Sequence, residues 1–308
     1  MYNYTIEAWN MNATAIAPSQ QLIEGDGRDF REHFNRVPFP VRHHLAGHPL
    51  FELPRLLEFA RTVAATNPGD IHYDTGDVSI NQRWSETATG GLPVDEAIRR
   101  IQEEKAWIFF KWAEKDKDYS ELLNQCLSEI GNLSGIDISR VMKVREAILF
   151  ITSPNRVTTY HIDRECNFLL QIVGSKVIHV FDREDRELLT EVELEHFWTV
   201  DNNYARYKEQ YQDRARTFHL QPSDGVHIPV NCPHWLKNDN NVSISLSVNF
   251  QYPDSARGNL YRANYALRKL GLHPNPPGQS PWRDVVKRSA VGGAVWCRNV
   301  FRAGRGRR

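Results

Sequence analysis

Residues 158–176 read TTYHIDRECNFLLQIVGSK, and this stretch decides the fold of the chain. Within it, residues 168–173 and 176–181 are short, apolar and rich in β-branched side chains, and Gly174-Ser175 has the composition of a tight hairpin turn. Many short strands separated by turns are typical of a sandwich or barrel, so we expect a mainly β core of the jelly-roll kind. Further strands of the same style are predicted at 147–151, 216–220, 226–230 and 242–250.

Outside these strands the chain is predicted to be largely helical. Apolar residues recur at helical spacing in several segments, and the clearest runs from Tyr119 to Ile130 with Gly131 as a candidate stop. We therefore expect a helical N-terminal region over residues 1–140 that packs on a barrel core over 141–253. C-terminal helices and a basic tail are expected over 254–308.

A polar, charged insert at residues 182–215 interrupts the series of strands. Thr190 and Glu193 have the spacing of a capping box, which favours a helix start inside the insert. The insert is either a packed surface excursion or a wall of the substrate pocket. The second interpretation depends on its aromatic residues, which are Trp198, Tyr204, Tyr207 and Tyr211.

The composition is that of a globular protein, since 41% of the residues are hydrophobic and 25% are charged. Residues 1–20 lack the pattern of a secretory signal, and no apolar run approaches the length of a membrane span. The four cysteines are widely spaced and form no C-x-x-C motif, which argues against a disulfide framework. We therefore expect a cytoplasmic protein that makes no membrane contact.

The charge is unevenly distributed, although the formal net charge is zero. Residues 283–308 hold eight Lys or Arg and one Asp, so the rest of the chain carries the opposite charge. A basic tail of this kind is either a solvated chain end or a weak contact for the phosphates of a nucleic acid.

Two segments carry residues suited to binding a metal. His161 and Asp163 stand two apart at a predicted strand end, so both side chains would point to the same side. Two histidines and one carboxylate can hold iron(II) on one face and leave the other positions open. His219, His227 and His234 compete for the third ligand. We favour His234, which follows a proline stop near the barrel mouth, whereas His227 lies within a strand and is expected to pack behind the site.

Other histidine motifs have a weaker context. His72-Tyr73-Asp74 repeats the H-x-D pattern, but it lies in a turn-like stretch and is interpreted as structural. His43, His44 and His48 are close in sequence, yet no strand or helix pattern places them on one face. We therefore do not expect a second metal site there.

The spacing of the two segments resembles that of the JmjC/cupin-like oxygenases, which include asparaginyl hydroxylases of the factor-inhibiting-HIF type. That class has a strand-end H-x-D/E, then N-F-x-x-Q-I-x-G-x-K, then P-G-D-x-x-x-x-P-x-x-x-x-H. Here the first run extends from His161 to Lys176 and the second from Pro222 to His234, with Ser223 where the class has glycine. The resemblance covers residues 144–251 and implies a double-stranded β-helix, or cupin barrel.

The resemblance also implies a set of residues that bind 2-oxoglutarate. Lys176 would pair with the distal carboxylate of this co-substrate, and Thr158 would hydrogen-bond the same group. Asn167 and Asn249 would help to place the end that chelates iron.

The implied activity is that of an Fe(II)- and 2-oxoglutarate-dependent dioxygenase, with His161, Asp163 and His234 as the metal ligands. It would hydroxylate a side chain of a protein or peptide and release succinate and CO2. One alternative is an RNA- or ribosome-directed oxygenase of the same fold, and another is a non-enzymatic metal-binding cupin with a regulatory role. Because helices after the barrel, here from Leu260, often pair in this class, the resemblance also favours a homodimer.

Overall fold

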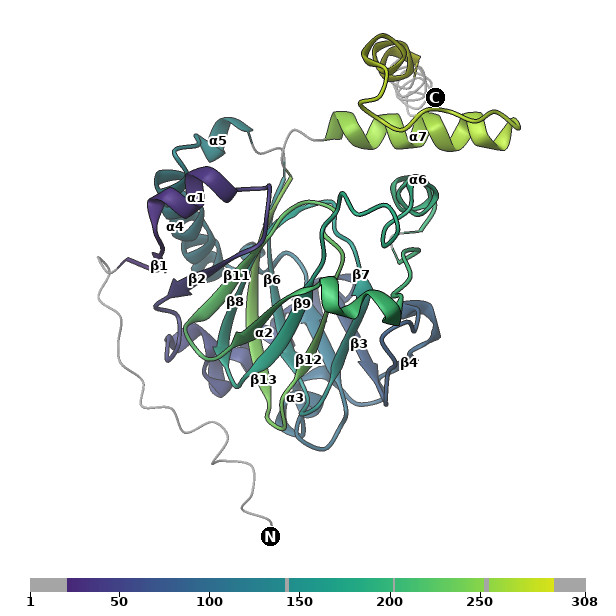
Figure 1. The fold of residues 1–308 in the computed structure, drawn as a ribbon. Coiled ribbons are helices and arrows are strands. Elements are labelled where there is room, and N and C mark those ends of the chain that lie inside the picture. Colours follow the sequence, from purple (N-terminus) through teal and green to yellow (C-terminus); the bar gives the residue numbers. More distant parts are fainter. Residues whose placement is uncertain (1–20, 142–143, 202, 252–254, 291–308) are drawn as a thin grey trace, which may run out of the picture.

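The computed structural model describes residues 21–141, 144–201, 203–251 and 255–290. Its centre is a pair of antiparallel sheets that face each other (Figure 1). In the described residues the larger sheet has nine strands in the order β1-β2-β11-β8-β13-β6-β5-β3-β4, and the smaller has four in the order β10-β9-β12-β7. The predicted mainly β core, a double-stranded β-helix of the cupin type, is confirmed.

The strands of both sheets are short, with the longest at the centre of the larger sheet. The larger sheet comprises β1 (Ile23–Glu24), β2 (Phe39–His43), β3 (Ile71–Thr75), β4 (Ala88–Thr89), β5 (Trp107–Phe110), β6 (Arg145–Thr152), β8 (Cys166–Val173), β11 (Asp224–Ile228) and β13 (Ser243–Phe250). The smaller sheet comprises β7 (Val157–His161), β9 (Lys176–Val180), β10 (Arg216–Leu220) and β12 (His234–Asn238).

The turn at Gly174-Ser175 leads from one sheet to the other. The predicted hairpin is wrong here, because β8 pairs with β11 and β13 whereas β9 pairs with β10 and β12. Gly174 has a φ of 71°, and a Cβ atom there would lie 2.1 Å from the carbonyl oxygen of Val242. The composition thus predicts a tight turn, but it cannot tell whether the two flanking strands become partners.

Apolar side chains from both sheets fill part of the space between them. Strand alternation sends every second side chain inward, and the inward residues of β9 and β11 meet those of β8 and β12. This inner cluster contains Leu169, Ile178, Val180, Leu220, Val226, Ile228, Cys232 and Leu236. The remaining space between the sheets is the cavity that holds the candidate site.

The N-terminal region contains strands as well as the expected helices. Strands β1 to β5 lie on both edges of the larger sheet and widen it. They have two to five residues each, which is too short for a visible period of two in the sequence. The helices of this region are α1 (Gly27–His33), α2 (Leu53–Thr66), α3 (Val94–Arg99), α4 (Lys117–Ser134) and α5 (Ile138–Val141).

Helix α4 covers the outer face of the larger sheet, where it packs against β6 and β13 (Figure 1). Its buried stripe follows the predicted spacing from Tyr119 to Ile130. The predicted stop at Gly131 is wrong, because the helix continues to Ser134 and ends at Gly135, whose φ of 70° is left-handed. Gly131 instead allows a close approach, since a Cβ atom there would lie 3.1 Å from the carbonyl oxygen of Ile136.

The insert forms helix α6 (Glu191–Thr199), which packs against helix α7 (Ser255–Lys269) beside the barrel (Figure 1). The capping box is confirmed: Thr190 Oγ1 accepts from the Glu193 amide at 3.2 Å, and Glu193 accepts from the Thr190 amide at 2.8 Å. The five arginines from Arg298 onward lie outside the described residues. Within the described residues, no helix is long and apolar enough to cross a membrane.

Candidate metal centre

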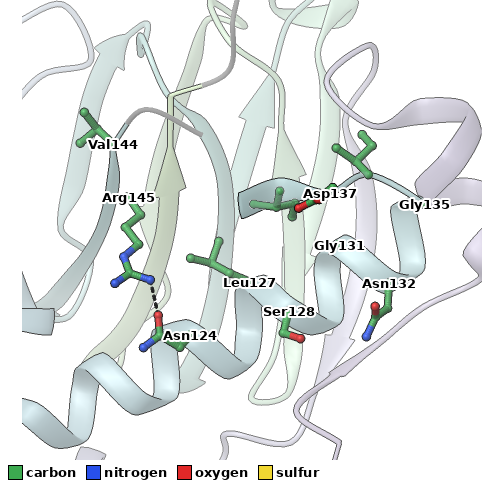
Figure 2. Close-up of a pocket in the computed structure, with 11 residues that line it drawn as sticks. Asn124, Leu127, Ser128, Gly131, Asn132, Gly135, Asp137, Val144 and Arg145 are labelled. Atoms are coloured by element: carbon green, nitrogen blue, oxygen red, sulfur yellow. Dashed lines mark hydrogen bonds between the residues drawn. The ribbon is translucent and has the colours of Figure 1, made fainter. Parts of the chain in front are cut away.

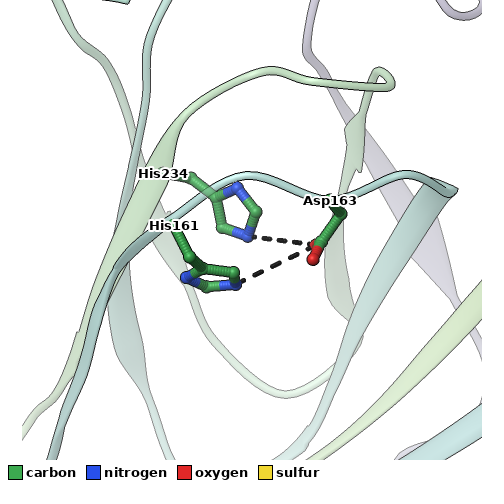
Figure 3. A group of neighbouring side chains, drawn as sticks. All are labelled: His161, Asp163 and His234. Atoms are coloured by element: carbon green, nitrogen blue, oxygen red, sulfur yellow. Dashed lines mark ion pairs between the residues drawn. The ribbon is translucent and has the colours of Figure 1, made fainter. Parts of the chain in front are cut away.

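His161, Asp163 and His234 meet at one end of the barrel (Figure 3). His161 is the last residue of β7, His234 is the first residue of β12, and the two are cross-strand partners. Asp163 lies just beyond β7, in the loop before β8. Its Oδ2 atom is 3.9 Å from His161 Nε2 and 3.6 Å from His234 Nε2. One potential ligand atom from each residue therefore faces a common point.

Backbone carbonyl groups orient both imidazoles. His161 Nδ1 lies 2.6 Å from the carbonyl oxygen of Thr159, and His234 Nδ1 lies 3.0 Å from that of Cys232. Each Nδ1 therefore carries the proton and donates it, which leaves the Nε2 lone pair facing Asp163. Burial, the largest cause, and the nearby His161 together lower the pKa of His234 to about 4, although Asp163 and the backbone hydrogen bond with Cys232 oppose this shift. His234 is thus a neutral imidazole at physiological pH, the form that binds metals.

A β-bulge in β7 brings Thr158 into the same cavity as His161. His234 pairs with His161, but Leu236 pairs with Thr158, so three steps along β7 oppose two steps along β12. The extra residue breaks the alternation of β7. Thr158 and His161, three apart, consequently both line the cavity. Simple strand alternation in the sequence would have placed them on opposite faces.

The cavity has a volume of about 300 Å³ and extends from the metal triad to Lys176. Lys176 is 5% exposed, and within the described residues its ammonium group has no hydrogen-bond or ion-pair partner. Burial lowers its pKa to about 7. A buried cation without a partner is costly, and an anionic ligand in the cavity would remove this cost.

Asn167 and Asn249 are cross-strand partners on β8 and β13, and both line the cavity. The buried hydroxyl of Ser247 lies 2.9 Å from Asn167 Oδ1 and 3.0 Å from Asn249 Oδ1. Ser247 therefore holds the two amides side by side. Sequence reasoning missed this role, although the alternation of serines along β13 was a visible signal.

His227 lies behind the site and supports Asn167. Its Nδ1 atom donates to the carbonyl oxygen of Asn167 at 3.0 Å, and its Nε2 atom accepts from the Asn35 amide at 2.9 Å. Burial lowers its pKa to about 3, so it stays neutral. His219 is exposed on β10. Of the three histidines considered as the third metal ligand, only His234 therefore lies beside His161 and Asp163.

Trp84, from the N-terminal region, also lines the cavity. The sequence did not predict this position for Trp84. Its Nε1 atom donates to Thr159 Oγ1 at 3.0 Å, and its ring centroid lies 5.5 Å from that of His161 in an edge-on arrangement. No local pattern marks this tryptophan, because its partner is 75 residues away. Other aromatic residues that line the cavity are Trp107, Phe109, Phe150 and Phe197.

Phe197 is the aromatic residue of the insert that reaches the cavity. The four aromatic residues named from the sequence do not line it; Trp198 packs in a separate cluster with Tyr160 and Tyr261, and Tyr207 lies against that cluster. The insert therefore packs mainly beside the cavity, and Phe197 is its one described residue that lines the cavity.

The other histidine motifs have local structural partners. His72-Tyr73-Asp74 forms part of strand β3, so the predicted turn is wrong, and Asp74 makes a buried ion pair with Arg156. His43 Nδ1 accepts from the Leu45 amide at 3.1 Å, and His48 Nδ1 accepts from the Leu50 amide at 3.2 Å. In the described residues, the only group of three or more His, Cys, Asp or Glu side chains placed to share a metal ion is the triad of His161.

A larger and more open hollow of about 780 Å³ lies beside helix α4 (Figure 2). Asn124 and Arg145 form a hydrogen bond at its edge. Asp137 is the one side chain with a carboxylate among its described lining residues, and the lining includes no histidine or cysteine. This hollow therefore lacks the donor set found between the sheets.

No protein-family model and no curated protein matches the sequence. Solved structures that resemble this one include Escherichia coli ycfD, with a TM-score of 0.51 and 12% identity over 90% of this chain and 69% of that one. A second is YcfD, a ribosomal oxygenase from Escherichia coli, in complex with cobalt and 2-oxoglutarate, with a TM-score of 0.50 and 14% identity over 89% and 67% of the two chains. At this identity the likeness concerns the fold, which this chain shares with YcfD.

Proposed function

We propose that this protein is an Fe(II)- and 2-oxoglutarate-dependent dioxygenase of the JmjC/cupin-like class that hydroxylates a side chain of a protein or peptide. One observation carries the proposal. A single cavity has two oriented histidines and a carboxylate at one end, and it also contains a buried, unpartnered lysine. A metal-binding face combined with a fixed cation suits a ligand that chelates a metal and ends in a carboxylate.

The residues present fit iron(II). His161, Asp163 and His234 would hold it through two imidazole nitrogens and one carboxylate oxygen, a donor set typical of non-heme iron(II) oxygenases. When bound, iron(II) supplies the redox chemistry that couples conversion of 2-oxoglutarate to succinate and CO2 with hydroxylation of the substrate. The hydrogen bonds to the carbonyl groups of Thr159 and Cys232 keep the imidazoles in place.

The remaining cavity residues would bind 2-oxoglutarate. Lys176 would pair with the distal carboxylate, a charge-assisted contact, and Thr158 would hydrogen-bond the same group. Asn167 and Asn249, held by Ser247, would place the chelating end. The fold shared with YcfD supports this assignment, because that protein is described in complex with cobalt and 2-oxoglutarate.

A protein side chain is the substrate that the resemblance to factor-inhibiting-HIF-type hydroxylases favours. A ribosome-directed oxygenase is the second candidate, because YcfD is described as a ribosomal oxygenase. Contact with a nucleic acid through the basic tail, and the homodimer, remain predictions from the sequence. A metal-binding cupin without turnover is the non-enzymatic alternative, and it predicts metal binding without succinate formation.

The first test is succinate formation from 2-oxoglutarate with iron(II) and ascorbate. We expect slow turnover by the wild type without added substrate, and its loss in His161→Ala and Lys176→Ala. His219→Ala is the matched control, since this histidine is exposed on β10 and should leave turnover unchanged. Anaerobic binding of 2-oxoglutarate to the iron-loaded protein distinguishes a coupled enzyme from a non-enzymatic cupin. Absence of both binding and turnover would refute the proposal.

A further inference from the structure

Two arginines beside the metal cavity lack an ion-pair partner among the described residues. Arg164 follows Asp163 in the loop between β7 and β8, and it lines the cavity. Arg262 lies on helix α7, where its side chain donates to the neutral amide of Asn259 at 2.8 Å. Both arginines are half-buried. Burying a cation without a counter-charge costs free energy, so the pair points to an anion that the described part of the chain does not supply.

The two guanidinium groups lie against the same tryptophan of helix α6. The Cζ atom of Arg164 is 5.4 Å from the centroid of the Trp198 ring, and that of Arg262 is 5.3 Å from it. Burial, and then the charge of Arg164, lower the pKa of Arg262, because the two cations repel each other. Helix α7 approaches the ring closely at Gly258, where a Cβ atom would lie 2.5 Å from a ring carbon. The packing of α6 against α7 therefore holds two like charges together.

Two buried N–H groups at this junction have no acceptor. The Nε atom of Arg164 and the Nε1 atom of Trp198 are fully buried, and neither has a hydrogen-bond partner in the described part of the chain. Another guanidinium nitrogen of Arg164 donates to the carbonyl oxygen of Phe197 at 2.8 Å, which fixes this side chain. Buried polar atoms almost always have a partner, and here the missing partner is an acceptor.

The neighbouring carboxylate does not neutralise the pair. Glu165 follows Arg164 in the sequence and attracts its charge, but the two side chains form no ion pair among the residues that the structure describes. Glu165 instead accepts from Gln251 Nε2 at 3.3 Å. The positive charge of the two arginines therefore remains available to a ligand.

The surroundings favour a single carboxylate over the phosphates of a nucleic acid. Glu146 and Glu165 line the same cavity as Arg164, and they would repel a chain of phosphates. Proteins bind nucleic-acid backbones through basic surfaces that neutralise several phosphates at once. A planar carboxylate, by contrast, matches the fork of N–H donors that a guanidinium group presents.

We propose that Arg164 and Arg262, beside Trp198, form a subsite for the carboxylate of an aspartate or glutamate residue in the substrate. This inference rests on the proposed function, because it concerns the peptide that would enter the metal cavity. Arg164 is adjacent to Asp163 in the chain, so an acidic residue bound there flanks the residue that reaches the metal. The acidic residue is recognised and is not itself modified.

The test compares acidic peptides with neutral peptides of the same shape. The acetylated and amidated tripeptides with glutamate or aspartate between two alanines are paired with their glutamine and asparagine counterparts. Binding to the metal-free full chain, at constant ionic strength, is followed by NMR through the indole N–H signal of Trp198, which Trp198→Phe assigns. We expect at least one acidic peptide to shift this signal and to bind at least about tenfold more tightly than its neutral counterpart.

Three variants assign the preference. Arg164→Met and Arg262→Met should each remove most of it, and because Arg262 lies on a separate element, its variant tests the site even where Arg164→Met does not fold. Arg283→Met is the matched control, since Arg283 lies 5.2 Å from the ring centroid of Trp282 but is exposed. Equal or undetectable binding of acidic and neutral peptides by the wild type, or a preference retained in either test variant, would overturn the inference.

Inorganic phosphate tests the alternative ligand, again at constant ionic strength. Tighter binding of phosphate than of either acidic peptide would overturn the assignment to a carboxylate. Peptide binding needs neither iron nor turnover, so the two proposals fail separately. An acidic preference without succinate formation under any condition would retain the subsite and refute the oxygenase. Succinate formation without an acidic preference would retain the oxygenase and refute the subsite.

Discussion

The indole of Trp84 donates a hydrogen bond of 3.0 Å to the hydroxyl of Thr159, and the carbonyl group of Thr159 in turn accepts from His161 Nδ1 at 2.6 Å. The N-terminal region is thereby linked to a candidate metal ligand through one residue of β7. This link gives the region a role in positioning the site, in addition to widening the larger sheet.

Replacing Trp84 should therefore weaken metal binding. Trp84→Phe keeps an aromatic ring but removes the donor, and we expect the iron(II) affinity to fall by about tenfold, the lower range for residues that orient metal ligands. Anaerobic titration of the metal-free protein with iron(II) measures this effect. Trp282→Phe is the control, because Trp282 is 67% exposed. An unchanged affinity in Trp84→Phe would show that the link is not needed.

Lys176 should destabilise the ligand-free protein. Its pKa is lowered from 10.5 to about 7 by burial, so between these values the unfolded state binds more protons and stability rises with pH. Below about pH 7 the full free-energy cost of burying the charged amine is present, and Lys176→Met should stabilise the ligand-free protein there by on the order of 5 kcal/mol. Urea unfolding at about pH 6 and pH 9 measures it. A variant that is equally stabilised at both values would contradict the assignment to Lys176.

The same substitution should remove the response to 2-oxoglutarate. In the wild type the co-substrate should raise the melting temperature in the presence of iron(II), because it binds only the folded state. Lys176→Met should lose most of this increase while it gains intrinsic stability. A co-substrate response that survives the substitution would contradict the proposed contact.

The ion pair between Arg156 and Asp74 should be essential for stability. Both side chains are 3% exposed, and the pair links the start of β7 to β3. Arg156→Met leaves a buried carboxylate without its partner, which typically costs about 3–5 kcal/mol. The double variant Arg156→Met with Asp74→Asn should recover part of this loss. Equal stability of the single variant and the wild type in urea would contradict the prediction.

Ser223 should be a site where glycine stabilises the fold. Its φ of 76° lies in the left-handed region, which is unfavourable for residues with a Cβ atom. We expect Ser223→Gly to increase the free energy of unfolding by about 1 kcal/mol, since the greater freedom of glycine in the unfolded chain offsets part of the gain. Ser223→Ala keeps the Cβ atom and is the control. A loss of stability in the glycine variant would contradict this interpretation.

Ser223 illustrates which properties of a turn can be predicted from the sequence. The JmjC/cupin-like class has glycine at this position, so the comparison with that class indicates only that the turn differs here. The structure adds that this turn is left-handed and that its backbone joins Gln171 to His43, since the Ser223 amide donates to Gln171 at 3.0 Å and its carbonyl group accepts from His43 at 2.9 Å. The dihedral angle depends on these two distant partners.

Local periodicity and turn composition in the sequence predicted β6, β8, β9, β10, β11 and β13 of the barrel, the helix α4 and the capping box at Thr190, but not β12, which carries His234. These are local properties, because a strand, a helix face or a cap involves residues a few positions apart. The tertiary structure alone decided that the chain changes sheets at Gly174, that a bulge brings Thr158 and His161 into one cavity, and that Trp84 and Glu146 face it. Each of these depends on which strands become neighbours, and pairing between residues far apart in the chain leaves no local pattern to read.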